Sequence, residues 1–113
     1  MGANKKDIQK MLGSLLAGGD TLSSSVVSNI IGDVAFFIPE TVSPLELLPL
    51  LKSESTQVRL AALVMLQLAE ATTGVEDELH LLKLDPNVEV RKAASYLIDN
   101  ILSWQLGQPT IKG

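Results

Sequence analysis

The stretch ELLPLLKSESTQVRLAA (residues 46–62) returns further along the chain as ELHLLKLDPNVEVRKAA (residues 78–94). The offset aligns Val58-Arg59 with Val90-Arg91. A period of this length is typical of stacked helical units, each of which buries its apolar face against its neighbours. The repeat predicts an all-α chain folded as a short α-α superhelix, or solenoid, of about three stacked antiparallel helix pairs.

The spacing of apolar residues predicts a helix at each of six positions, over about 4–17, 22–38, 44–52, 56–72, 73–84 and 87–105. Ser43-Pro44-Leu45-Glu46 is a capping box with proline at the first helical position, and Thr73 with Glu76 makes a second possible box. The segment 56–72 is apolar nearly all round, which is typical of a helix buried on most sides. We therefore expect it in the middle of the stack.

The whole chain, 1–113, is expected to form a single domain of three repeats. Shifting back by the same offset from Val58 reaches Val26, so residues 4–38 are interpreted as a degenerate first repeat. The second repeat covers 43–72 and the third covers 73–105. Residues 106–113 are expected to form a flexible tail.

Charge and composition narrow the functional classes. The formal net charge is −4, and residues 39–113 carry ten acidic against six basic residues, which opposes binding to nucleic acids and to anionic membranes. Aromatic residues are only 4% of the chain, too few for a platform that stacks bases. The chain has no cysteine, which excludes disulfides and thiolate chemistry and fits a cytoplasmic location. Charged residues near the start interrupt any signal peptide, and no apolar segment is long enough to span a membrane.

The repeated phrase, with paired leucines, an Asp-Pro-Asn turn and Val-x-Val-Arg-x-Ala-Ala, resembles HEAT and HEAT-like repeats, and most closely the phycobilisome-lyase type. The resemblance covers about 43–104. It implies a structural role for the repeated arginines, which bond the turn between two helices with the turn aspartate as a usual partner. That role falls on Arg91 with Asp85, and in part on Arg59, because Ser53 stands where Asp85 stands in the next repeat.

No residue set in the sequence makes a catalytic, cofactor-binding or metal-binding constellation. His80 is the single histidine, and Glu76 is its only local partner for proton transfer. The acidic residues around it lack the alternating spacing of a calcium loop and suit the start of a helix instead. We therefore expect a protein that is not an enzyme and needs no cofactor.

The sequence favours a protein-interaction or scaffold module, because stacked helices offer an extended surface without a convergent polar pocket. Phe36 and Trp104 are the candidate anchors. Gln67, Glu70 and Asp99 occupy repeat positions where DNA-binding HEAT-like proteins carry Lys and Arg, so a protein contact is expected there. The partner is expected to be a helix or peptide of basic character, or a second copy of the chain. The family resemblance leaves one alternative, an accessory subunit of a chromophore lyase or a chaperone-like repeat protein.

Overall fold

The computed structural model describes residues 5–102, and every regular element in this range is helical. The α-helices are α1 (Lys5–Gly18), α2 (Ser24–Phe36), α3 (Leu48–Leu51), α4 (Thr56–Ala69), α5 (Glu76–Leu82) and α6 (Val88–Leu97). Two 3-10 segments, η1 (Gly19–Thr21) and η2 (Pro44–Leu47), precede α2 and α3, and a π-helical segment, η3 (Ile98–Leu102), extends α6. The prediction of an all-α fold is confirmed.

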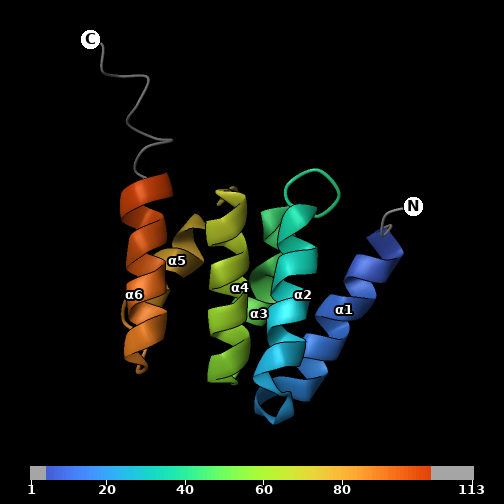
Figure 1. The fold of residues 1–113 in the computed structure, drawn as a ribbon. Helices are drawn as coiled ribbons and strands as arrows, with labels where there is room; N and C mark the ends of the chain where they lie inside the picture. The colour runs from blue at the N-terminus through green and yellow to red at the C-terminus, as the bar shows by residue number, and fades with distance from the viewer. Residues whose placement is uncertain (1–4, 103–113) are drawn as a thin grey trace.

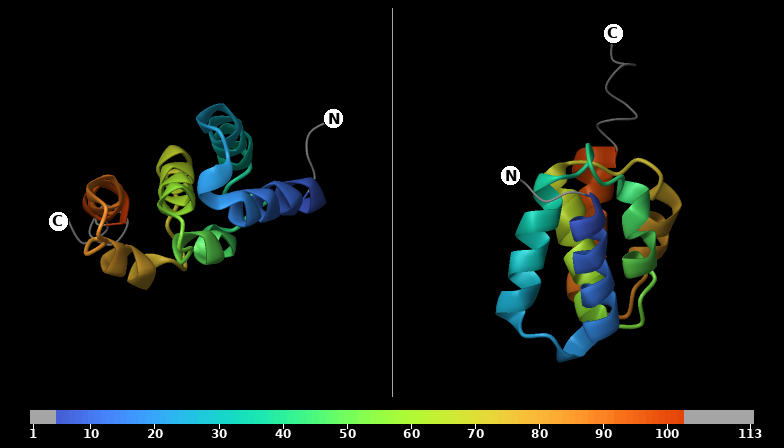
Figure 2. Two further views of the ribbon diagram at one scale, coloured as in Figure 1. Left: turned by 90° about the horizontal axis from the view of Figure 1, so that it is seen from below. Right: turned by 90° about the vertical axis from the view of Figure 1, so that its right-hand side faces the viewer.

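The helices form two layers (Figures 1 and 2). Helices α2, α4 and α6 lie side by side in one layer, which we name the front layer. Helices α1, α3 and α5 lie in the other, the back layer. Within the front layer, α4 packs against α2 on one side and α6 on the other, while α3 packs behind it. Helix α4 therefore has neighbours on three sides.

The three front-layer helices begin at a constant interval. Their first residues, Ser24, Thr56 and Val88, are separated by the same offset that relates the two copies of the repeated phrase. The residue before each helix is its N-cap, and the cap side chain accepts a backbone N–H three residues on: Ser23 from Val26, Ser55 from Val58, and Asn87 from Val90, at 3.3, 3.2 and 3.1 Å. The sequence offset is therefore an offset of helix starts, because each start has the same kind of polar cap.

The predicted capping box at Ser43 is present. The Ser43 hydroxyl accepts the N–H of Leu45, and Glu46 accepts the N–H of Ser43 at 3.1 Å. That backbone hydrogen bond, with Lys5 and Gln9 beside the same carboxylate, holds the pKa of Glu46 below its ordinary value. Lys5 Nζ lies 3.2 Å from Glu46 Oε2, so the box also fastens α1 to η2.

Several expected helix ends are corrected. Residues 44–47 form a 3-10 turn before α3, because Pro49 has no N–H with which to continue an α-helical ladder. Helix α5 begins at Glu76 with Val75 as an N-cap that makes no side-chain bond, so the Thr73 capping box is wrong. Glu76 instead accepts the N–H of Gly74. The end of the third repeat (103–105) and the tail (106–113) lie outside the described residues.

Helix α4 ends at Ala69 rather than at 72, because Glu70 adopts a left-handed conformation with φ of 54°. Ala71 donates its N–H to the carbonyl of Leu66 and Glu70 donates to that of Gln67, each at 3.2 Å. This pair of bonds is the Schellman motif, whose left-handed position is usually glycine. An acidic side chain there also lies at the negative end of the helix dipole.

The core is continuous through both layers and is centred on α4. Six residues of α4 are buried: Val58, Ala61, Ala62, Leu63, Met65 and Leu66. Four leucines from other elements are also fully buried in this core: Leu47 of η2, Leu51 of α3, Leu79 of α5 and Leu97 of α6. Burial of such apolar surface contributes about 25 cal/mol per Å² and stabilises the fold. Within the described residues, no helix combines the length and apolar character that crossing a membrane requires.

Burial on α4 predicts a sharp contrast between two of its leucines. Leu63 is 0% exposed and Leu68 is 61% exposed. Leu63→Asp should cost more than about 4 kcal/mol, since it removes packed atoms and buries a charge without a partner. Leu68→Asp should change stability by no more than about 0.5 kcal/mol. Urea unfolding followed by circular dichroism measures both, and a Leu63→Asp protein that unfolds like wild type contradicts the packing of α4.

The left-handed conformation of Glu70 predicts a stabilising substitution. Glu70→Gly should raise the free energy of unfolding by about 0.5–1 kcal/mol, because glycine adopts positive φ without strain and the charge at the helix end is removed. Gly74, with φ of 93°, is the matched control: Gly74→Ala should destabilise the protein, since the new Cβ would lie 3.3 Å from Leu45 Cβ. The same urea titration decides, and a Glu70→Gly protein less stable than wild type would refute the assignment.

Candidate functional site

The repeated arginine Arg59 lies in a buried ion pair. Its Nε lies 2.9 Å from Oδ1 of Asp85, an ionic contact in which the N–H makes no hydrogen bond, while Nη2 donates to Asp85 Oδ2 at 3.2 Å. The Arg59 Nη1 donates to the carbonyl of Ser53 at 2.8 Å, and Nη2 also donates to Thr56 Oγ1. The two charged side chains are 13% and 6% exposed, so the pair is shielded from water.

Asp85, in the turn between α5 and α6, therefore binds Arg59, which lies in the earlier copy of the repeated phrase. The family resemblance pairs Asp85 with Arg91, but the Arg91 guanidinium donates only to backbone carbonyls, those of Asp85 (2.8 Å) and Pro86 (3.1 Å). The carboxylate is occupied by Arg59 and by the N–H of Asn87 at 2.9 Å. Both arginines reach a carbonyl six residues before them in sequence, so their contact with the preceding turn is equivalent.

A second turn carboxylate reaches the same helix start from the other side. Asp20 Oδ1 accepts the hydroxyl of Ser55 at 2.7 Å and the N–H of Gln57 at 3.3 Å. The Gln57 amide in turn donates to the carbonyls of Gly19 (2.8 Å) and Leu22 (3.2 Å). The bond from Ser55, and then that from Gln57, holds the pKa of Asp20 below its ordinary value.

These contacts form what we name the turn network: Asp20, Ser55, Gln57, Arg59, Asp85 and Arg91. It joins the turns of all three helix pairs at the N-terminal end of α4. Because Arg59 already binds a carboxylate and a carbonyl, it is not available to bind a phosphate. The network therefore links α4 to the turn before α2 and to the turn before α6.

Two grooves lie on opposite layers of the molecule. The first, which we name the leucine groove, has a volume of about 730 Å³ between α3, α5 and the turn after α5. It is lined by Leu51, Lys52, Glu54, Arg59, Glu78, Leu81, Leu82, Leu84, Asp85 and Pro86. Leu51 and Leu82 are buried at its floor, whereas Leu81 and Leu84 are 62% and 81% exposed. A pair of leucines this exposed at one groove is typical of a contact surface.

The leucine groove has an excess of negative charge. Lys52 Nζ lies 3.8 Å from Glu78 Oε1, and Arg59 is paired with Asp85, so each base that lines the groove faces an acid. Glu54 is the lining acid that makes no ion pair with any described residue. The acidic residues of the first turn of α5 add to the negative charge nearby. The groove thus combines exposed apolar side chains with an acidic rim.

The second groove, which we name the uncharged groove, lies between α2 and α4 in the front layer and has a volume of about 370 Å³. Its lining contains no charged residue: Ser24, Val27, Ser28, Ile31, Thr56, Gln57, Leu60, Ala61 and Val64. Depletion of charge is typical of the central part of protein interfaces.

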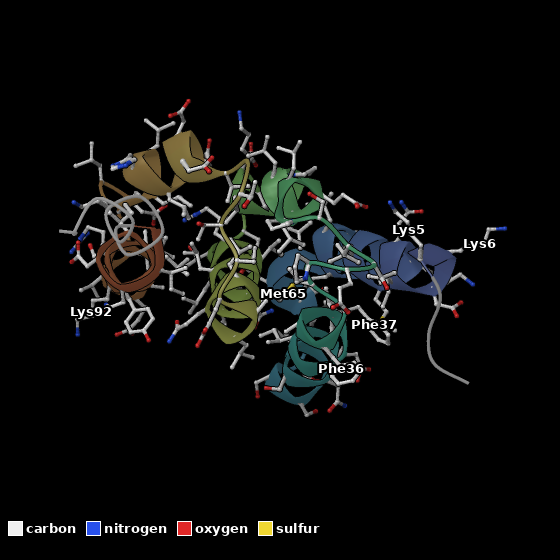
Figure 3. All side chains as sticks on the ribbon, turned by 90° about the horizontal axis from the view of Figure 1, so that it is seen from above. Lys5, Lys6, Phe36, Phe37, Met65 and Lys92 are labelled. Carbon is white, nitrogen blue, oxygen red and sulfur yellow. The ribbon has the colours of Figure 1, made fainter. Side chains whose placement is uncertain are left out.

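The structure places the predicted contact residues on the front layer or beyond the described range. Phe36 ends α2 and is 81% exposed, touching Phe37 edge to face with ring centroids 5.2 Å apart. Figure 3 shows these two rings together at one end of α2. Gln67 is half-buried near the end of α4, while Glu70 and Asp99 are exposed at the ends of α4 and α6. Trp104 lies outside the described residues, and the interface role of all five stays a prediction.

Sequence reasoning missed Leu81 and Leu84. The sequence does contain a signal for them. Leu79 and Leu82, three residues apart, are enough to form the buried side of a short helix. Leu81 and Leu84 are therefore not needed for the core. In the register of the repeat, Leu84 stands where the exposed Lys52 stands one unit earlier. An apolar residue at a solvent position of the repeat is a marker that the alignment could have given.

His80 is exposed on α5, and among residues 5–102 no group of three or more His, Cys, Asp and Glu side chains is placed to hold a metal ion. Comparison of the chain with protein-family models, with curated proteins and with solved structures finds no match.

The turn network predicts unequal effects for its two arginines. Arg59→Ala should cost about 3–5 kcal/mol, because it leaves the buried Asp85 without its cation. Arg91→Ala should cost only about 1 kcal/mol, since its partners are carbonyls near solvent. The double variant Arg59→Met with Asp85→Leu should recover part of the loss, because it removes both charges together. Urea unfolding of the four proteins measures this, and equal losses for the two arginines would contradict the network.

Proposed function

We propose that the chain is a cytoplasmic, non-enzymatic protein-interaction module, a short stack of HEAT-like helix pairs. Its leucine groove binds a helix or peptide that carries apolar side chains and at least one Lys or Arg. The observation that carries this proposal is the exposure of Leu81 and Leu84 beside Glu54, an acid that makes no ion pair with any described residue.

The stacking part of the proposal is supported by three regularities. The front-layer helices start at a constant interval, their N-caps bond in the same way, and the two arginines contact the preceding turn in the same way. Hydrogen bonds of the turn network then pass from each pair to the next. Units that contact only their neighbours through such repeated positions are characteristic of solenoids.

The chemistry of the partner follows from the groove. Leu81 and Leu84 are among its lining residues, so an apolar side chain packed against them would remove their surface from water at about 25 cal/mol per Å². A Lys or Arg of the partner would meet Glu54 without displacing an ion pair of the described residues. An acidic partner would instead face Glu54 and the first turn of α5, which carries three acids in a row.

The test compares capture by two variants of the tagged, full chain in extracts of its native cell. Leu81→Ser with Leu84→Ser removes the two exposed leucines that line the groove, whereas Leu45→Ser removes an exposed leucine of η2 that does not line it. We expect a stoichiometric protein partner bound by wild type and by Leu45→Ser, with affinity reduced at least about tenfold by the double variant. For that purified partner, Glu54→Gln should slow association more at low salt than at high salt.

The proposal fails on either of two results. One is that no stoichiometric protein partner is found. The other is that a partner binds the double variant as tightly as it binds wild type. Circular dichroism melts of all three proteins establish that loss of binding is not loss of folding.

A further inference from the structure

Arg91 is held in place in the same way as Arg59, but one edge of its guanidinium has no described partner. Each arginine donates Nη1 to the carbonyl six residues before it, at 2.8 Å. In Arg59, the edge formed by Nε and Nη2 faces the two oxygens of Asp85, at 2.9 and 3.2 Å. In Arg91, Nη1 also donates to the carbonyl of Pro86, while Nε and Nη2 make no hydrogen bond or ion pair with any described residue. We name this edge of Arg91 the open fork.

The open fork lies at the outer end of the stack. Helix α6 is the last helix of the front layer, with no described helix beyond it (Figure 1). Arg59 directs its Nε and Nη2 away from α2, towards the turn before α6. Arg91 has the same position in its helix and the same contact with the turn before it, and it is half-buried. It therefore directs the open fork away from α4, to the side where a further helix pair would stand.

The acidic residues nearest to Arg91 in sequence do not fill the open fork. The Asp85 carboxylate is occupied by Arg59. Glu89 precedes Arg91 by two residues, so it projects from the opposite side of α6. Asp99 lies about 12 Å further along the helix axis, which is too far for a direct pair. Residues 100–113 contain no aspartate or glutamate.

The side chains beside the open fork favour a negatively charged ligand. Val88, Arg91 and Lys92 are spaced i, i+3 and i+4, so they share one face of α6. Lys92 is exposed, and Figure 3 shows it on the side of α6 that faces away from α4. Val88 is 46% exposed and adds apolar surface next to the two cations. This part of α6 is therefore basic, although the chain as a whole has a net charge of −4.

The contact between Arg59 and Asp85 is a template for the missing ligand. Asp85 precedes the N-cap residue of α6, Asn87, by two residues, and it also accepts the N–H of Asn87. Its carboxylate thus belongs to the turn that starts the second helix of a pair, and the turn presents it to the arginine of the preceding pair. An arginine edge matches the two oxygens of a carboxylate in geometry as well as in charge. The ligand that fits the open fork in the same way is an aspartate or glutamate in the turn of a further helix pair.

We propose that the open fork is a docking site for a partner protein, which places a helix pair on the outer face of α6 and pairs a turn carboxylate with Arg91. Ser95 stands where α4 has the buried Leu63, so this contact buries less apolar surface than the contact between α4 and α6. Binding therefore depends more on charge, and salt weakens it. Arg91 does not line the leucine groove, so the site is independent of the basic partner proposed above.

Nitrogen-15 NMR of the full chain tests the site, because the chain has two arginines and therefore two Nε–H signals. The probe is an unlabelled peptide of residues 71–102, which contains the helix pair that presents Asp85. It should shift the Arg91 signal and leave the Arg59 signal in place, since Arg59 already has a carboxylate. The matched control is the same peptide with Asp85→Asn, which should bind about fivefold more weakly because a neutral acceptor forms a weaker hydrogen bond.

An extended chain supplies the same helix pair without the need for a free peptide to fold. Residues 71–102 are repeated directly after Leu102, so the copied aspartate follows Arg91 by the 26 residues that separate Arg59 from Asp85. Arg91→Ala should then shift the urea midpoint of the extended chain at least about twice as far as that of the natural chain. Replacing the copied aspartate by asparagine should remove the difference. Leu81→Ser, at an exposed leucine of the other groove, should shift both chains equally.

Three results overturn the proposal. The first is that the peptide leaves the Arg91 signal unmoved and Arg91→Ala shifts both chains equally, or that the asparagine controls act like their aspartate counterparts. The second is that the Arg91 Nε–H of the free chain already exchanges as slowly as that of Arg59, because the fork then has a partner within the chain. The third is that inorganic phosphate, titrated in the same way, shifts the Arg91 signal at lower concentration than the peptide, which would make the fork a phosphate site.

Discussion

The structure depends on the need to cover α4. Between Thr56 and Ala69 the chain has one charged residue, Arg59, and three uncharged polar ones, Thr56, Gln57 and Gln67, so an isolated α4 would expose apolar surface over most of its circumference. The chain covers it with α2 on one side, α6 on the other and α3 behind. Helices α2 and α6 belong to the helix pairs on either side, and α3 is the helix that precedes α4 in its own pair. The need to cover α4 therefore places it in the middle of its layer.

Polar contacts then fix where the pairs meet. Two carboxylates from neighbouring turns contact residues at the start of α4. Asp20, before α2, accepts a hydrogen bond from Ser55, and Asp85, before α6, pairs with Arg59. Apolar packing is not directional, whereas an aspartate that accepts a hydroxyl, or that pairs with a guanidinium in a shielded place, allows only one register. We infer that hydrophobic burial holds the layers together and that the turn network sets their alignment.

The sequence predicts the helices well, but it predicts poorly which residues of different helix pairs contact one another. The offset between the two copies of the repeated phrase anticipated the starts of α4 and α6, because a polar N-cap followed by an apolar run is a local signal. The capping box at Ser43 was local in the same way. Asp85 and Arg59 are 26 residues apart, so their pairing depends on how the helix pairs meet and cannot be read from spacing within one repeat.

The grooves were hidden from sequence reasoning for a related reason. Leu60 and Val64 look like core residues in the pattern, and whether each is covered depends on which neighbour packs over it. Leu84 differs, because its position in the repeat is a solvent position. Of the predicted contact residues, Phe36 is exposed at the end of its helix, as a candidate anchor must be. The two layers thus each carry a groove, lined by different residues.

Native-state hydrogen exchange tests the central claim about α4 most directly. Amides of residues 58–66 should exchange most slowly of all and only by global unfolding, because α4 loses its cover only when its neighbours separate. Amides of α1, which packs at one edge of the molecule, should exchange faster through local opening. If α4 exchanges as fast as α1 while other helices stay protected, then α4 is not the element on which the fold is built.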